Sequence, residues 1–219
     1  MSVSQKVLVL GLGASGRTAA RFYASRGFEV LAADTRQQPP KLEELQQEIA
    51  NLRFLGAQVT PETAAEVSEV MISPGLSPEY SVFAPVVKEA RQHGIPVVGE
   101  IELFARELKK LKAESGYAPK IIGITGTNGK TTTTMLSTAI IAEAGRSVVA
   151  AGNVGPNALG ELEKHRLAGT LPDVWVLDLS SFQLANTESL HCDSAPLLNI
   201  PEDPNDWPGS MAQSPAAKR

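Results

Sequence analysis

A glycine-rich segment at residues 126–131 constrains the fold of this chain more than any other feature. It follows a short apolar run at residues 121–124 and contains Lys130 and Thr131 just before a predicted helix. Backbone N–H groups in such a loop bind an anion, the lysine reaches the β- and γ-phosphates of a nucleotide, and the threonine hydroxyl binds Mg²⁺. The general pattern has glycine at the position of Ile124. The strand–loop–helix context still predicts a phosphate-binding loop.

A second glycine-rich turn, at residues 11–16, has the spacing G-x-G-x-x-G. It follows the apolar run of residues 6–10 and precedes a helix predicted for residues 17–26. Glycines there allow a tight turn and a close approach of phosphate oxygens to a helix N-terminus. Asp34 ends the next predicted strand and can accept a hydrogen bond from a ribose or a base edge. The pattern leaves three interpretations open: a structural turn, a nicotinamide dinucleotide site, or a site for another nucleotide diphosphate.

Strands and helices alternate along the chain. Apolar runs predict further strands at residues 29–33, 67–73, 95–98, 120–124, 147–151, 173–179 and 195–200. Such alternation is typical of α/β proteins with parallel sheets and right-handed crossovers. The polar stretch at residues 112–119 predicts a linker, and hence a first domain of residues 1–115 and a second of residues 116–219.

Three polar residues follow or end strands of the second domain. Lys130 comes after the first of these strands, Asn153 after the second and Asp178 at the end of the third. Ligands of open α/β sheets gather at the carboxyl ends of the strands, so we expect these side chains to converge. Asp178 there is either a second Mg²⁺ ligand or a simple helix cap.

Composition restricts the class of protein. Lys and Arg number 20 against 24 Asp and Glu, so the net charge of −4 argues against non-specific nucleic-acid binding. The single cysteine, Cys192, excludes an internal disulfide framework and fits a reducing cytoplasm. No apolar run approaches the roughly 20 residues of a membrane span. His93, His165 and His191 lack metal-ligand spacing and are predicted to be surface or hydrogen-bonded side chains.

Seven motifs, in this order, resemble those of the Mur ligases of peptidoglycan synthesis. They are GLGASG at residues 11–16, DTR at 34–36, ISPG at 72–75, GEIELF at 99–104, GITGTNGKT at 123–131, GNVG at 152–155 and LSSFQL at 179–184. The TGTNGKT loop marks a superfamily that also contains folylpolyglutamate synthases. The DTR, SPG and LSSFQL segments are similar to those of the D-glutamate-adding branch.

The resemblance implies a fold and a first binding site. The expected architecture is α/β: a Rossmann-like UDP-binding domain followed by part of a P-loop ATPase domain with a three-layer parallel sheet. The first domain then binds UDP rather than NAD. By position, the diphosphate contacts are Ala14 and Ser15, the uridine contacts are Asp34, Thr35 and Arg36, and the same pocket is lined by Ser73, Pro74 and Gly75.

The resemblance also implies an activity. Relatives of this kind ligate D-glutamate to UDP-N-acetylmuramoyl-L-alanine with ATP and Mg²⁺, through an acyl phosphate, as cytoplasmic monomers that use neither nucleic acid nor membrane. The implied ATP-binding residues are Gly126, Thr127, Asn128, Gly129, Lys130, Thr131, Thr132 and Thr133. Asn153 and Ser180 also match UDP-substrate positions, and Thr131, Asp178 and Lys218 match metal positions. The implied catalytic residues are Lys130, Asn153, Asp178 and Lys218.

Three positions depart from the family pattern. Asp178 stands where glutamate is usual, Pro204 stands where a metal-binding histidine is expected, and Lys218, which matches a carbamylated lysine, is followed by one residue. From these we expect a chain truncated within the ATPase domain, without the C-terminal domain, that binds the UDP substrate but does not complete ligation. The alternatives are a UDP-nucleotide-binding remnant without ligase activity and an NAD-binding domain joined to an unrelated P-loop protein.

Overall fold

The computed structural model describes residues 5–199, and these fall into two compact units that divide between Glu100 and Ile101. The sequence-based boundary lies further along the chain, after residue 115. The helix between the two positions, α5 (Glu100–Ser115), packs with the second unit: the Phe104 ring meets the Trp175 ring edge-on, with centroids 5.2 Å apart. The last turn of α5 therefore occupies part of the predicted linker.

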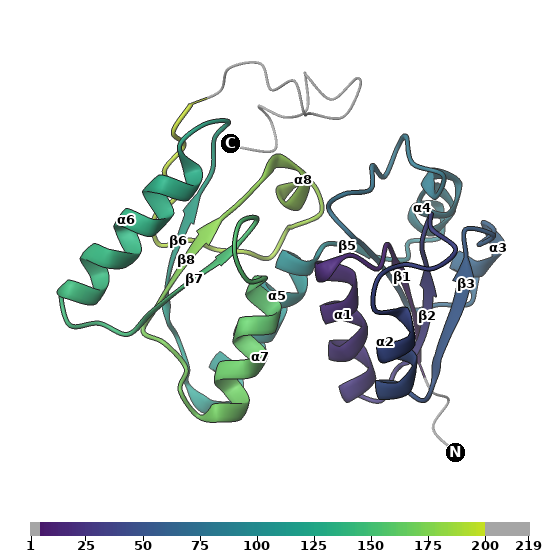
Figure 1. The fold of residues 1–219 in the computed structure, drawn as a ribbon, viewed down its shortest axis with the longest axis horizontal. Helices are drawn as coiled ribbons and strands as arrows, with labels where there is room; N and C mark the ends of the chain where they lie inside the picture. Colours follow the sequence, from purple (N-terminus) through teal and green to yellow (C-terminus); the bar gives the residue numbers. More distant parts are fainter. Residues whose placement is uncertain (1–4, 200–219) are drawn as a thin grey trace. The chain divides into compact units, whose positions relative to one another are not determined.

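The first unit is a parallel five-stranded sheet in the order β3-β2-β1-β4-β5, with helices between successive strands (Figure 1). Its strands are β1 (Lys6–Leu10), β2 (Glu29–Ala33), β3 (Leu52–Gly56), β4 (Glu69–Ile72) and β5 (Val97–Val98). Its helices are α1 (Ala14–Ser25), α2 (Leu42–Glu48), α3 (Glu62–Ala65) and α4 (Ala84–Gln92). In register, Val7 lies opposite Val30 of β2 and Glu69 of β4, so β1 is central.

The central strand is buried on both faces because helices cover each side. Leu8 and Leu10 join a core with Ala64 of α3 and Val87 of α4. Side chains alternate along a strand, so Val7 and Val9 point to the face of the sheet opposite to the one that Leu8 and Leu10 share with α3 and α4. Right-handed crossovers place α1 and α2 on that side, since β1, β2 and β3 step in one direction and β4 and β5 in the other. The strand order therefore changes direction between β1 and β4, and open α/β sheets bind ligands at such a point.

The second unit also has a parallel sheet, in the order β6-β8-β7 (Figure 1). Its strands are β6 (Lys120–Ile124), β7 (Val148–Gly152) and β8 (Val174–Asp178), and its remaining helices are α6 (Lys130–Glu143), α7 (Ala158–Ala168) and α8 (Ser181–Leu184). Ile124, Val176 and the partly buried Ile141 of α6 form the core on one face. Trp175 points to the other face, where it contacts Phe104 of α5 and His165 of α7. The α/β fold class and the parallel sheets predicted from the sequence are confirmed.

Two predicted features differ in the structure. Strand β3 was not predicted: its buried Leu52 and exposed Arg53 alternate as in an edge strand, and it lacks the continuous apolar run of the other strands. The strand predicted for residues 195–200 is present only as two isolated bridges, Ile122 to Ser194 and Thr125 to Leu197, within the described residues. The segment nevertheless runs parallel to β6 along its outer edge.

Gly16 provides a direct test of the packing beside β1. A Cβ built on Gly16 lies 1.8 Å from the carbonyl oxygen of Gly11, whereas one on Gly75 has no atom within 4 Å. We expect Gly16→Ala to lower the free energy of unfolding of the first unit by about 3 kcal/mol or more, since backbone must move. Gly75→Ala, the matched control, changes it by less than about 0.5 kcal/mol. Urea unfolding followed by far-ultraviolet circular dichroism measures both, and equal midpoints contradict the expectation.

Candidate functional site

A cavity of about 350 Å³ lies at the carboxyl ends of β1, β2 and β4 in the first unit. All the first-unit residues predicted to contact UDP line it: Ala14, Ser15, Asp34, Thr35, Arg36, Ser73, Pro74 and Gly75. They come from the start of α1 and from the loops after β2 and β4, which the strand order brings together. Gly11, Gly13 and Leu76 complete the wall. The size falls within the range of small-ligand pockets.

The floor of this cavity depends on a glycine turn. Gly11 has a φ of +86°, which side-chain-bearing residues rarely adopt. The Ser73 hydroxyl donates a 2.7 Å hydrogen bond to the Gly11 carbonyl oxygen. The loop after β4 is thereby attached to the loop after β1, and the N-terminal end of α1 stays open toward the cavity.

Asp34 links the glycine turn to the loop after β2. Its buried carboxylate accepts hydrogen bonds from the Leu12 backbone N–H at 2.7 Å and from the Arg36 guanidinium at 2.8 Å. Burial opposes ionisation of this carboxyl, but the hydrogen bonds from Arg36 and Leu12 outweigh burial and lower the pKa of Asp34 to about 2. Asp34 therefore stays ionised at neutral pH and holds Arg36 at the cavity wall.

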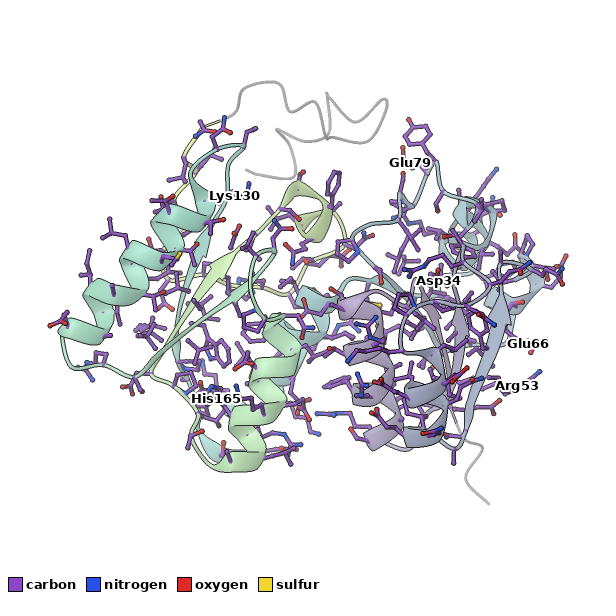
Figure 2. The ribbon with its side chains drawn as sticks, in the orientation of Figure 1. Asp34, Arg53, Glu66, Glu79, Lys130 and His165 are labelled. Atoms are coloured by element: carbon purple, nitrogen blue, oxygen red, sulfur yellow. The ribbon has the colours of Figure 1, made fainter. Side chains whose placement is uncertain are left out.

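The loop that the sequence predicts to bind phosphate lies at the end of β6 in the second unit. Gly129 is left-handed, with a φ of +83°, and precedes α6. Lys130 begins that helix (Figure 2), and its Nζ donates to the carbonyl oxygens of Gly126 and Thr127 at 2.8 and 3.2 Å. The ammonium therefore lies over the loop in which phosphate is expected. Thr131, Thr132 and Thr133 form the first turn of α6.

Asp178 ends β8 opposite this loop. Its Oδ2 accepts a 3.2 Å hydrogen bond from the Thr131 hydroxyl, while its buried Oδ1 has no partner within the described residues. Burial raises the pKa of Asp178, although the Lys130 ammonium and the Thr131 hydroxyl act in the opposite direction. An orphaned carboxylate oxygen beside a threonine hydroxyl is a donor set that fits Mg²⁺, which commonly binds one carboxylate together with nucleotide phosphates.

Two family models together match most of the chain. Residues 5–99 match "Mur ligase MurD-like, N-terminal domain", and residues 124–219 match "Mur ligase middle domain". The chain belongs to the Mur ligase family.

Individual relatives agree with this assignment. The chain is 51% identical over 212 residues to UDP-N-acetylmuramoylalanine–D-glutamate ligase of Ralstonia nicotianae and 50% identical to that of Cupriavidus pinatubonensis. Each alignment covers 97% of this chain and 42% of the relative, so the chain spans less than half the length of these curated relatives. Among solved structures, a UDP-N-acetylmuramate:L-alanyl-gamma-D-glutamyl-meso-diaminopimelate ligase from Neisseria meningitides shares the fold, with a TM-score of 0.53, 15% identity, and coverage of 99% of this chain and 68% of that one.

Other predicted Mur ligase residues lie elsewhere. Asn153, after β7, is exposed, and its backbone N–H donates to the Asp178 carbonyl oxygen at 2.7 Å. The Ser180 hydroxyl caps α8 through Gln183. Both belong to the second unit. Pro204 and Lys218 lie outside the described residues.

Two further residues of the second unit make contacts that were not predicted from the sequence. Glu102 of α5 accepts hydrogen bonds from Arg106, from the Glu188 N–H, and from the backbone and hydroxyl of Ser189. Burial opposes ionisation, yet these bonds outweigh it and lower the pKa of Glu102. Asn199 contacts the phosphate-binding loop directly. Apart from Arg106, the partners of these two residues lie more than 70 residues away in the chain, so no local pattern predicts these contacts.

Neither a clustered metal site nor a membrane span occurs within residues 5–199. No three His, Cys, Asp or Glu side chains gather there as a group that could hold a metal ion. A Mg²⁺ ion held by Asp178, Thr131 and phosphate oxygens needs no such cluster. No helix in these residues has both the length and the apolar character to cross a bilayer.

The Asp34 carboxylate predicts a pH dependence of stability. Its pKa is about 2 in the folded chain against an ordinary 3.8, so its stabilising contribution is complete above about pH 4 and is lost as the pH falls toward 2. We expect Asp34→Asn to lower the free energy of unfolding by about 1–2 kcal/mol at pH 6. The difference from the parent chain should shrink steadily between pH 4 and about 2. Urea unfolding at several pH values measures this.

The control for this experiment is Glu66→Gln, which alters an exposed carboxylate of the same unit. It should leave the free energy of unfolding almost unchanged across the same pH range. A difference between Asp34→Asn and the parent chain that does not vary with pH contradicts the assigned role of the ionised carboxylate.

Proposed function

We propose that this chain supplies the UDP-substrate site and the ATP-binding loop of a ligase that joins D-glutamate to UDP-N-acetylmuramoyl-L-alanine. The observation that carries the proposal is the convergence of all eight predicted first-unit contacts on one cavity, in a chain of the Mur ligase family. The two named relatives, which share about half of the 212 aligned residues with this chain, are named as UDP-N-acetylmuramoylalanine–D-glutamate ligases.

The first-unit cavity suits a nucleoside diphosphate. The N-terminal end of α1 opens at Ala14 and Ser15, where backbone N–H groups favour phosphate oxygens. Arg36 adds a positive charge at the wall, held in place by Asp34. The loop after β4, with Ser73 and Pro74, closes the side of the cavity next to the glycine turn.

The second-unit loop suits ATP with Mg²⁺. The Lys130 ammonium offers hydrogen bonds and charge to the β- and γ-phosphates, and the Thr131 hydroxyl with the free Oδ1 of Asp178 offers ligands to the metal. Bound Mg²⁺ supplies neutralisation of phosphate charge. Aspartate is one methylene shorter than the usual glutamate, and the Thr131 hydrogen bond fixes its orientation toward the loop.

The proposed chemistry needs positioning and charge neutralisation rather than a protein nucleophile. The substrate carboxylate attacks the γ-phosphorus of ATP, the bond to the bridging oxygen of ADP breaks, and an acyl phosphate results. The D-glutamate amine then attacks the acyl carbon and expels phosphate. Lys130 stabilises the charge that develops on the transferred phosphoryl group and on ADP.

The alternative function is UDP-nucleotide binding without ligation. D-glutamate-dependent release of ADP from ATP, measured with UDP-N-acetylmuramoyl-L-alanine present, separates the two. Release above the level seen without D-glutamate supports a ligase, while saturable binding of the UDP ligand with no release supports the binding function alone.

Arg36 tests the first site. We expect calorimetric titration to show saturable binding of UDP-N-acetylmuramoyl-L-alanine, and no binding of NAD. Arg36→Gln should weaken binding about tenfold, because a charge-assisted hydrogen bond is lost. Arg53→Gln, on β3 outside the cavity, is the matched control and should keep the parent affinity. Binding of NAD in place of the UDP ligand defeats the proposal.

Lys130 tests the second site. We expect Lys130→Met to weaken binding of ATP with Mg²⁺ about 100-fold, since it removes charge-assisted hydrogen bonds to a highly charged triphosphate. Lys164→Met on α7 removes a comparable charge that pairs with Glu161, and should leave the affinity unchanged. Chelation of Mg²⁺ should weaken ATP binding to the parent chain, because the Asp178 carboxylate then faces the phosphates without a cation. Equal affinities of the two variants contradict the assignment of the loop.

A further inference from the structure

Asn199 makes four hydrogen bonds to the phosphate-binding loop. Its Oδ1 accepts from the backbone N–H groups of Thr127 at 3.1 Å and Asn128 at 2.9 Å. Its Nδ2 donates to the Asn128 carbonyl oxygen at 2.9 Å, and its own carbonyl oxygen accepts from the Thr127 N–H at 3.3 Å. One side chain thus contacts two consecutive peptide groups of the loop.

The segment before Asn199 lies close enough to the loop to keep this contact in place. The Leu198 N–H donates to the Thr125 carbonyl oxygen at 3.0 Å, continuing the parallel bridges along β6. A Cβ built on Gly126 lies 3.1 Å from the Leu198 Cβ and 3.2 Å from the Asn199 nitrogen. The missing side chain of Gly126 therefore makes room for this segment as well as for a turn.

The N–H groups of residues 127–132 divide into two sets. Those of Thr127 and Asn128 donate to Asn199. Within the described residues, the N–H groups of Gly129, Lys130, Thr131 and Thr132 have no acceptor, because they belong to the start of α6. The second set is the one that remains available for phosphate oxygens.

We propose that Asn199 is a positioning residue that holds the loop from one side so that the four N–H groups of residues 129–132, at the start of α6, are oriented toward phosphate. The proposal rests on the proposed function, in which ATP binds this loop. A loop that is ordered before binding loses less conformational entropy when the nucleotide arrives, and this raises affinity.

The chemistry of asparagine fits this role. Its amide accepts and donates at the same time, which matches two N–H groups and one carbonyl oxygen in the loop. Aspartate can accept from both N–H groups but cannot donate to the carbonyl oxygen, and it places a negative charge beside the triphosphate. Alanine can do neither.

The experiment uses the 219-residue chain with Asn199→Ala, Asn199→Asp and the control Asn51→Ala, which removes an exposed amide bonded to Phe28 in the first unit. Amide hydrogen exchange, followed residue by residue by NMR without nucleotide, reports on the Thr127 and Asn128 N–H groups. Calorimetry then gives the affinity of each chain for ATP with Mg²⁺.

We expect Asn199→Ala to speed exchange at Thr127 and Asn128 by about tenfold or more, and to weaken ATP binding about tenfold, while exchange in β8 is unchanged. Asn199→Asp should keep slow exchange at both N–H groups yet weaken ATP binding, because its charge repels phosphate. Asn51→Ala should change neither quantity.

Three results overturn the proposal: unchanged exchange at Thr127 and Asn128 in Asn199→Ala, faster exchange spread equally through β6 and β8, or lost protection with the parent affinity for ATP. The comparison of ATP affinities requires that the parent chain binds ATP. If the parent chain binds no ATP, the proposed function fails, whereas exchange without nucleotide still decides whether Asn199 holds the loop.

Discussion

Close approach of one backbone segment to another, at places where no Cβ fits, is the constraint on which both candidate sites depend. A Cβ on Gly16 meets the Gly11 carbonyl oxygen at 1.8 Å, and one on Gly152 meets the Asp178 carbonyl oxygen at 2.2 Å. The close approach at Gly16 packs the start of α1 against the turn after β1, and the one at Gly152 packs the end of β7 against the end of β8. In each unit the loops that carry polar groups are therefore held close together by the backbone.

The pKa of the carboxylate in each site depends on how many hydrogen-bond donors surround it. Asp34 is surrounded by donors, so its charge is satisfied and its pKa falls to about 2. Asp178 has one hydroxyl donor and one oxygen without a partner among the described residues, so burial dominates and its pKa rises. Asp34 therefore stabilises the cavity wall through its own hydrogen bonds, whereas the Asp178 carboxylate is suited to bind a cation.

The sequence was sufficient for those parts of the structure that local patterns encode. Continuous apolar strands, both glycine turns and Asp34 could be identified from local patterns, whereas the other predicted residues that line the first-unit cavity came from the resemblance to the Mur ligases. Edge strand β3, with Arg53 exposed, lacked that pattern. The contacts of Glu102 and Asn199 could not be predicted, because hydrogen bonds between segments 70 or more residues apart depend on packing that no local pattern specifies.

The distribution of indole rings has a practical consequence. Both tryptophans of the chain, Trp175 and Trp207, follow the division after Glu100, and Trp175 is fully buried with its Nε1 donating to the Tyr117 hydroxyl at 2.9 Å. Tryptophan emission is therefore an optical signal of the second unit alone, while the first unit is silent at those wavelengths. The melting of either unit can be assigned in one sample, without a label, by comparing emission with the circular dichroism of the whole chain.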